Sequence, residues 1–173
     1  MTSAPRSAIR TEADDPTVLV ISRLIDAPRA LVWRLWTDPA HAMRWMGPVG
    51  FTVTHFAQDA RPGGRWRLCL TPDTGCLTPD TGGPSLWQGG VCLKAVEPET
   101  LVYTFAWQDE AGRATGPDMF VTVTFAEDGD RTRLTFRQEG FASVAMRDGH
   151  RDGWSSSFAR LADTAIVLKQ TAA

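Results

Sequence analysis

The segment from Ile21 to Pro48 restricts the fold of this chain more than any other part of the sequence. An alternating apolar run over residues 17–26 predicts a first strand, which ends at the Asp-Ala-Pro of residues 26–28. Two helices are predicted after this strand. The second is short, because Asp38 is a favoured helix N-cap, Pro39 is a favoured first helical residue, and Gly-Pro at residues 47–48 ends it. The first helix is predicted from apolar residues at the spacing of one helical face, namely Leu31, Val32, Leu35 and Trp36.

The rest of the chain has the pattern of strands and then that of one long helix. Turn-forming residues, among them Arg-Pro-Gly-Gly at 61–64, separate the alternating runs. The predicted strands are residues 51–60, 65–71, 86–97, 101–108, 119–127 and 131–139. Beyond them the spacing becomes helical, and Ser143 is a suitable N-cap for a C-terminal helix. The apolar stripe of that helix consists of Trp154, Phe158, Leu161, Ala162 and Ala165.

These elements predict an α+β fold of the helix-grip type. An antiparallel sheet of six or seven strands needs cover on its apolar face, and the long helix is large enough to provide it. We therefore expect a curved sheet wrapped around the C-terminal helix, with the two short helices closing one end. We assign a single domain to residues 17–170 and expect the polar residues 1–16 to form a disordered leader. A cavity between such a sheet and helix is the default place for a ligand.

A tandem repeat interrupts the pattern between two of the strands. The heptads at 70–76 (LTPDTGC) and 77–83 (LTPDTGG) differ only in their last residue, and each carries the Pro, Asp and Gly of turns. A lengthened surface loop of this kind costs little chain entropy. We expect residues 71–85 to form a loop with little effect on function.

Composition and charge exclude several classes of function. The net charge of −2 and the pI of about 5.9 provide no basic surface for nucleic acid. The sequence has no apolar run long enough for a membrane span and no signal-peptide pattern. Cys69, Cys76 and Cys92 fit reduced thiols in a cytoplasmic protein. Neither these cysteines nor the histidines have metal-ligand spacing, so we expect no metal and no cofactor.

Several short motifs, taken in their order along the chain, resemble one known family. They are Asp26-Ala27-Pro28, Val32-Trp33, Thr37-Asp38-Pro39, Arg44-Trp45, Gly47-Pro48, Gly63-Gly64-Arg65-Trp66, Leu101-Val102-Tyr103-Thr104-Phe105 and Gly153-Trp154. Over residues 18–168 the chain is similar to the heat-shock-protein-90 ATPase activator homologue-like family of the START-like, birch-pollen-allergen-like (SRPBCC) superfamily. The resemblance implies the same helix-grip fold.

The resemblance implies no single activity. Members of the superfamily include carriers of hydrophobic ligands, aromatase/cyclases and a chaperone-activating domain. In the eukaryotic activators a separate N-terminal domain carries much of the chaperone contact. Residues 1–16 are too few for such a domain, which argues against contact with a chaperone.

Aromatic side chains are the candidate ligand-binding residues. Core packing accounts for most of them, and the others line an incompletely filled cavity in which the Tyr103 hydroxyl or an indole N–H orients a ligand. Tyr103 shares a strand face with Leu101, Phe105 and Trp107, and we expect this face to point inward. We assign no catalytic residue, because no titratable groups converge and the serines at 155–157 lack a Gly-x-Ser-x-Gly motif. The full set of candidates is Trp66, Trp87, Tyr103, Phe105, Trp107, Phe120, His150, Trp154 and Phe158.

The sequence therefore favours a binding module over an enzyme. We expect a cytoplasmic START-like protein that binds a small hydrophobic or aromatic molecule between the sheet and the C-terminal helix. Two alternatives stay open. One is a cyclase- or hydrolase-type enzyme in which Tyr103 and His150 act in the same pocket, and the other is a protein-interaction module like the chaperone activator. The sequence also leaves open whether the chain forms a homodimer.

Overall fold

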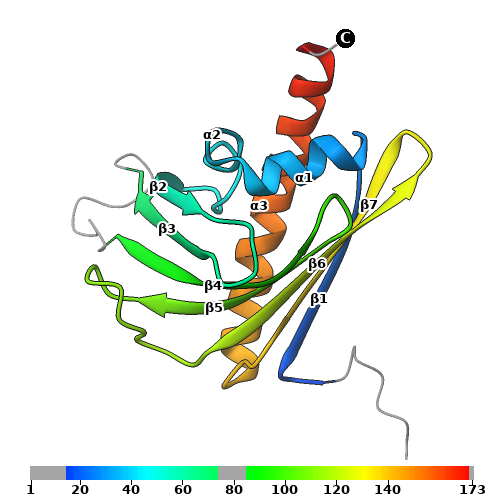
Figure 1. The fold of residues 1–173 in the computed structure, drawn as a ribbon. Coiled ribbons are helices and arrows are strands. Elements are labelled where there is room, and N and C mark those ends of the chain that lie inside the picture. The colour runs from blue at the N-terminus through cyan, green and yellow to red at the C-terminus, as the bar shows by residue number, and fades with distance from the viewer. Residues whose placement is uncertain (1–14, 74–84, 172–173) are drawn as a thin grey trace, which may run out of the picture.

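Seven antiparallel strands form one sheet in the computed structural model, which describes residues 15–73 and 85–171. The strand order is β1-β7-β6-β5-β4-β3-β2, so β1 and β2 are the two edges. Along the chain the elements are β1 (Val18–Ile25), α1 (Arg29–Thr37), α2 (Pro39–Ala42), β2 (Phe51–Gln58), β3 (Arg65–Pro72), β4 (Leu86–Val96), β5 (Thr100–Gln108), β6 (Met119–Asp128), β7 (Arg131–Glu139) and α3 (Val144–Thr171) (Figure 1).

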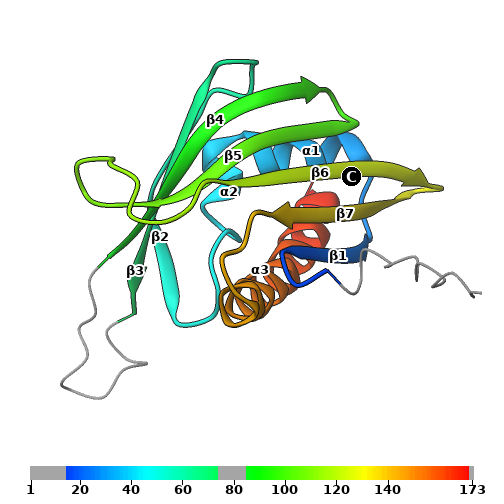
Figure 2. The same ribbon diagram turned by 90° about the horizontal axis from the view of Figure 1, so that it is seen from below.

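The sheet is curved, and the long helix α3 lies along its concave side. Figure 2 shows the sheet arching over α3, with α1 and α2 also on the concave side. The tertiary contacts of α3 are mainly with β1 and α1. The predicted helix-grip arrangement of a curved sheet, two short helices and a long C-terminal helix is thus confirmed.

The two short helices form where the sequence predicts them. The predicted apolar stripe of α1 is buried. Asp38 then caps α2, because its side chain accepts a hydrogen bond of 2.9 Å from the backbone N–H of Ala40. Trp45, just beyond α2, is fully buried, and its indole N–H donates to the carbonyl of Leu35 over 2.7 Å. This bond fixes the end of α2 against α1.

Side-chain alternation gives the sheet one buried face and one solvated face. On β7, Leu134 and Phe136 are buried, whereas Arg131 and Arg133 are exposed, as predicted. The inner face also carries a buried threonine. This residue is Thr132, whose hydroxyl donates a hydrogen bond to the carbonyl of Ala27 over 2.7 Å. A buried polar group therefore ties β7 to the chain between β1 and α1.

The predicted connection between β3 and β4 lies largely beyond the described part of the structure. β3 itself continues through Thr71 and Pro72, because these residues pair with Thr52 and Phe51 of β2. The expected loop therefore begins later than residue 71. Residues 74–84 of this loop and residues 1–14 of the expected leader lie outside the described residues. Among residues 15–73 and 85–171, no helix is long and apolar enough to cross a membrane.

Candidate ligand-binding pocket

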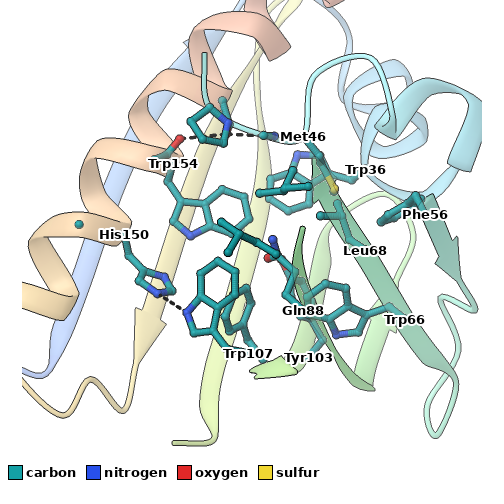
Figure 3. Close-up of a pocket in the computed structure, with 18 of the residues that line it drawn as sticks. Trp36, Met46, Phe56, Trp66, Leu68, Gln88, Tyr103, Trp107, His150 and Trp154 are labelled. Atoms are coloured by element: carbon teal, nitrogen blue, oxygen red, sulfur yellow. Dashed lines mark hydrogen bonds between the residues drawn. The ribbon is translucent and has the colours of Figure 1, made fainter. Parts of the chain in front are cut away.

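A pocket of about 350 Å³ lies between the N-terminal half of α3 and the inner face of β2–β5 (Figure 3). The strand registers place four of its residues side by side across the sheet, in the order Trp107, Gln88, Leu68 and Phe56. The lining residues are Trp36, Met46, Gly47, Pro48, Phe56, Gln58, Trp66, Leu68, Leu70, Leu86, Gln88, Tyr103, Phe105, Trp107, Ala145, Met146, Gly149, His150, Gly153, Trp154 and Ser157.

A stripe of small residues on α3 forms one wall of the pocket. Ala145, Gly149, Gly153 and Ser157 recur every four residues and therefore share one face of the helix. A Cβ atom added to Gly149 or Gly153 would meet no atom of the surrounding protein within 4 Å. The missing side chains thus account for part of the open space beside the helix.

A chain of hydrogen bonds joins α3 to the sheet along the same wall. The Trp107 indole N–H donates to Nε2 of His150 over 3.1 Å (Figure 3). Nδ1 of His150 lies 3.1 Å from Oε1 of Gln138, which also accepts from the Trp154 indole N–H over 3.0 Å. The amide nitrogen of Gln138 contacts the sulfur of Met119 at 3.6 Å. The network uses both indole N–H groups within the protein, so these two tryptophans offer a ligand only their rings.

The network also fixes the protonation of His150. An indole N–H can only donate, so Nε2 of His150 carries no proton and Nδ1–H donates to Gln138. Burial lowers the pKa of His150 to about 4. A proton added to Nε2 would face the Trp107 N–H, which disfavours the charged form further. His150 is therefore neutral at physiological pH and acts as part of the pocket wall.

Other polar groups of the lining have no partner within the described residues. Tyr103 and Gln88 are 5% and 8% exposed, and no hydrogen bond of either side chain is present in this part of the chain. The indole N–H of Trp36 and the amide oxygen of Gln58 are likewise buried and unpartnered there. Burial raises the pKa of Tyr103 and keeps its hydroxyl neutral. Buried polar groups are normally paired, so the Tyr103 hydroxyl and the Gln88 amide are available to a bound molecule. The Trp36 and Gln58 atoms have almost no accessible surface and are closed to it.

Charged side chains are absent from the described lining of the pocket, which contains no Asp, Glu, Lys or Arg. Arg160, on the next turn of α3, donates to the carbonyls of Gly47 and Phe51. Within residues 15–73 and 85–171, no group of three or more His, Cys, Asp or Glu side chains could hold a metal ion. The arrangement can therefore enclose an uncharged molecule and form hydrogen bonds with it.

The structure brings most of the predicted site residues together. Tyr103 and Phe105 point into the pocket from the inner face of β5, as the alternation of that strand predicts. The predicted residues that line the pocket are Trp66, Tyr103, Phe105, Trp107, His150 and Trp154. Their contact with a ligand stays a prediction.

Three predicted residues do not line the pocket, which corrects the sequence-based set. Trp87 lies on the outer face of β4, where its ring packs against His55 at 5.5 Å and against the Arg67 guanidinium at 3.9 Å. Phe120 is 44% exposed on β6, because its neighbours in the strand occupy the inner face. Phe158 is only 1% exposed and packs in the core between Trp36, Trp45 and Phe136.

Sequence reasoning missed the small and polar residues of the lining. Gln88 carries no aromatic signal, but it lies two residues from Leu86 on β4 and therefore shares its strand face. Glycine is a weak helix former, so Gly149 and Gly153 by themselves indicate no role in a pocket. Their four-residue spacing, continued by Ala145 and Ser157, was the signal that could have identified the wall.

Comparison with known proteins identifies a family and a common fold. The model of the family described as "Activator of Hsp90 ATPase homolog 1-like protein" matches residues 26–165. No protein of curated function matches the sequence. A solved structure of a Chromobacterium violaceum protein has 26% identity and a TM-score of 0.74, covering 87% of this chain and 98% of that one.

Two further solved structures show the same fold at lower identity. An Arthrobacter aurescens protein has 21% identity and a TM-score of 0.74, over 92% of this chain and 91% of that one. The AHSA1 protein of Silicibacter pomeroyi has 22% identity and a TM-score of 0.73, over 88% of this chain and 99% of that one.

Proposed function

This chain belongs to the activator of Hsp90 ATPase homolog 1-like family, and we propose that it is a single-domain protein that binds one small apolar or aromatic molecule between α3 and the sheet. The observation that carries the proposal is the pocket of about 350 Å³ with its aromatic lining. Ligand pockets in proteins are typically about 300–1,000 Å³, are mostly apolar and contain a few polar groups that orient the ligand. The unpartnered Tyr103 hydroxyl and Gln88 amide fit this description.

The pocket favours binding over acid–base catalysis. The basic nitrogen of His150 already accepts a hydrogen bond from Trp107, and burial lowers the pKa of the imidazole to about 4. Burial also raises the pKa of Tyr103, so the phenol holds its proton at neutral pH. An enzymatic acid or base works best with a pKa near the working pH. These two residues, the candidates for an enzymatic role, are instead suited to shaping the pocket and forming neutral hydrogen bonds.

We also assign the protein to the cytoplasm. Cys69 and Cys92 are free and buried on the neighbouring strands β3 and β4. Unpaired thiols of this kind are usual in a reducing compartment.

Two measurements test the proposed binding. Native mass spectrometry of protein purified from its own host should show a co-purifying small molecule. The neutral naphthalene dye prodan should bind the emptied protein at about one per chain, with the blue-shifted emission of an apolar site. At a hundred times its dissociation constant it should raise the free energy of unfolding by about 2.7 kcal/mol.

Absence of both a bound molecule and prodan binding would contradict the proposal. The description of the family would then direct attention to the alternative of a protein-interaction module. That alternative predicts that the chain stimulates the ATPase of a chaperone from its own host, and that substitutions inside the pocket leave this stimulation unchanged.

A further inference from the structure

The chemistry of the pocket restricts the class of ligand. We propose that it selects an uncharged aromatic molecule that carries a neutral hydrogen-bonding group, and that it discriminates against the anionic and cationic analogues of the same molecule. This inference rests on the proposed function and goes further by naming the charge and polarity of the ligand.

The first argument is the lack of any counter-charge. The described lining contains no charged side chain. His150, a residue that could supply a positive charge, is held neutral by its bonds to Trp107 and Gln138. A carboxylate or ammonium group moved into this pocket would lose its hydration and gain no partner of opposite charge, which is strongly unfavourable.

The second argument is the set of neutral polar groups without partners. The Tyr103 hydroxyl and the Gln88 amide can each donate and accept a hydrogen bond. Both side chains are buried, and in the described residues neither has a hydrogen-bonding partner in the protein. A ligand with a hydroxyl or carbonyl group would satisfy at least one of them, whereas a pure hydrocarbon would leave both unpaired.

The third argument is shape and size. At the packing density of protein interiors, about 0.74, a pocket of this volume holds at most about 260 Å³ of ligand atoms. Trp66 of β3 and Phe105 of β5 line the pocket from the sheet, with ring centroids 5.7 Å apart. Trp154 lines it from α3 (Figure 3). Aromatic rings contact other flat rings favourably in stacked or edge-to-face arrangements. The pocket thus fits a small ring system better than a long acyl chain.

A matched set of probes tests the proposal with the full-length protein. Naphthalene, naphthalenemethanol, naphthoate and naphthylmethylammonium share one ring system and differ in charge and polarity. Their dissociation constants are measured by fluorescence near pH 7.5, together with that of prodan. We expect naphthalenemethanol to bind most tightly, and the two charged probes to bind about 100-fold or more weakly than it does.

Variants locate the selectivity in the pocket. Tyr103→Phe should reduce the advantage of naphthalenemethanol over naphthalene by about tenfold if its hydroxyl is the partner. Gln88→Glu should improve binding of naphthylmethylammonium relative to naphthoate, because it adds a buried carboxylate. Leu93→Glu is the matched control, since Leu93 is exposed on the same strand and outside the lining. It should leave all four dissociation constants unchanged.

The outcomes separate the inference from the proposed function. Equal affinities for the neutral and charged probes, within about threefold, would overturn the inference while the binding function stands. Selectivity that is unaffected by Gln88→Glu and Tyr103→Phe would also overturn it, because the discrimination would then arise elsewhere. If neither naphthalene nor prodan binds, the proposed function itself fails and the inference with it.

Discussion

The imidazole of His150 accepts a hydrogen bond from the indole N–H of Trp107 over 3.1 Å, which joins the long helix to the middle of the sheet. This single contact determines which nitrogen of His150 is protonated. The indole N–H can only donate a hydrogen bond, so the nitrogen that faces it must be the unprotonated one. It also holds both side chains in the pocket wall. A change in this hydrogen bond would therefore also change the wall of the pocket.

We predict that His150 makes folding sensitive to acid. Its pKa in the folded protein, about 4, lies below the usual value of 6.5, so the unfolded chain binds more protons between these pH values. Stability is then fully present above pH 6.5 and falls as the pH decreases toward 4. Between pH 6.5 and 5 the loss due to His150 should be about 1–2 kcal/mol. Urea denaturation at a series of pH values measures it.

The control for this prediction separates His150 from the carboxylates that also titrate in acid. His150→Gln should flatten the pH dependence above pH 5, because it removes the imidazole whose pKa burial lowers. Parallel pH profiles for the wild-type protein and His150→Gln would contradict the assignment. Imidazole nitrogen chemical shifts should independently show the proton on Nδ1 of His150.

Gln138 should contribute more to stability than a polar residue with a single bond on the same strand. It is fully buried and accepts from both His150 and Trp154, so Gln138→Leu leaves two donors unpaired. We expect a loss of about 2–4 kcal/mol in the free energy of unfolding. Thr132→Val is the matched comparison, since it removes one hydrogen bond to Ala27 and should cost about 1–2 kcal/mol. Equal losses would indicate that the network adds nothing to its separate bonds.

Phe158 and Trp154 should differ in their contribution to stability although they lie one turn apart on α3. Phe158 is fully enclosed by rings, and Phe158→Ala should cost about 3–5 kcal/mol. Trp154 borders the pocket and is partly exposed, so Trp154→Ala removes fewer contacts and should cost about 1–3 kcal/mol. Chemical denaturation compares the two variants. A larger loss for Trp154→Ala would show that the pocket beside it is filled in solution.

Local sequence patterns predicted the fold because each element carries its own signal. The apolar stripe of α1, the Asp38 cap and the alternation of β7 depend only on neighbours in the chain, and the structure contains all of them. The inward face of β5 with Tyr103 followed from the same rule. Phe120 and Trp87 were assigned to the site because they are aromatic, although strand alternation places them on the outer face.

The polar contacts of the site were beyond the reach of local patterns. His150 and Trp107 are 43 residues apart in the sequence, and their hydrogen bond depends on how the helix lies on the sheet. The empty volume itself depends on residues that lack side chains. Glycine has no side chain that could contact a ligand, so the sequence alone does not indicate that Gly149 and Gly153 form a wall of the pocket.

Filling the pocket from the helix should change stability and binding in opposite directions. Gly153 lies within α3, where alanine is favoured over glycine by about 1 kcal/mol, so Gly153→Ala should raise the free energy of unfolding by about that amount. Gly153→Leu should also be at least as stable as the wild-type protein, because its side chain enters open space and gains apolar contacts. The same side chain occupies the volume that prodan needs, so dye binding should fall at least tenfold.

The exposed residue Ala159 on the same helix provides the control for this last prediction. Ala159→Leu adds the same side chain outside the lining and should leave prodan binding unchanged. Thermal melts and fluorescence titrations of the three variants give both quantities from one preparation. Ordinary destabilisation would lower stability and binding together, so a stable Gly153→Leu that no longer binds the dye locates the ligand beside α3. Unchanged dye binding by a stable Gly153→Leu would instead show that the dye binds elsewhere on the protein.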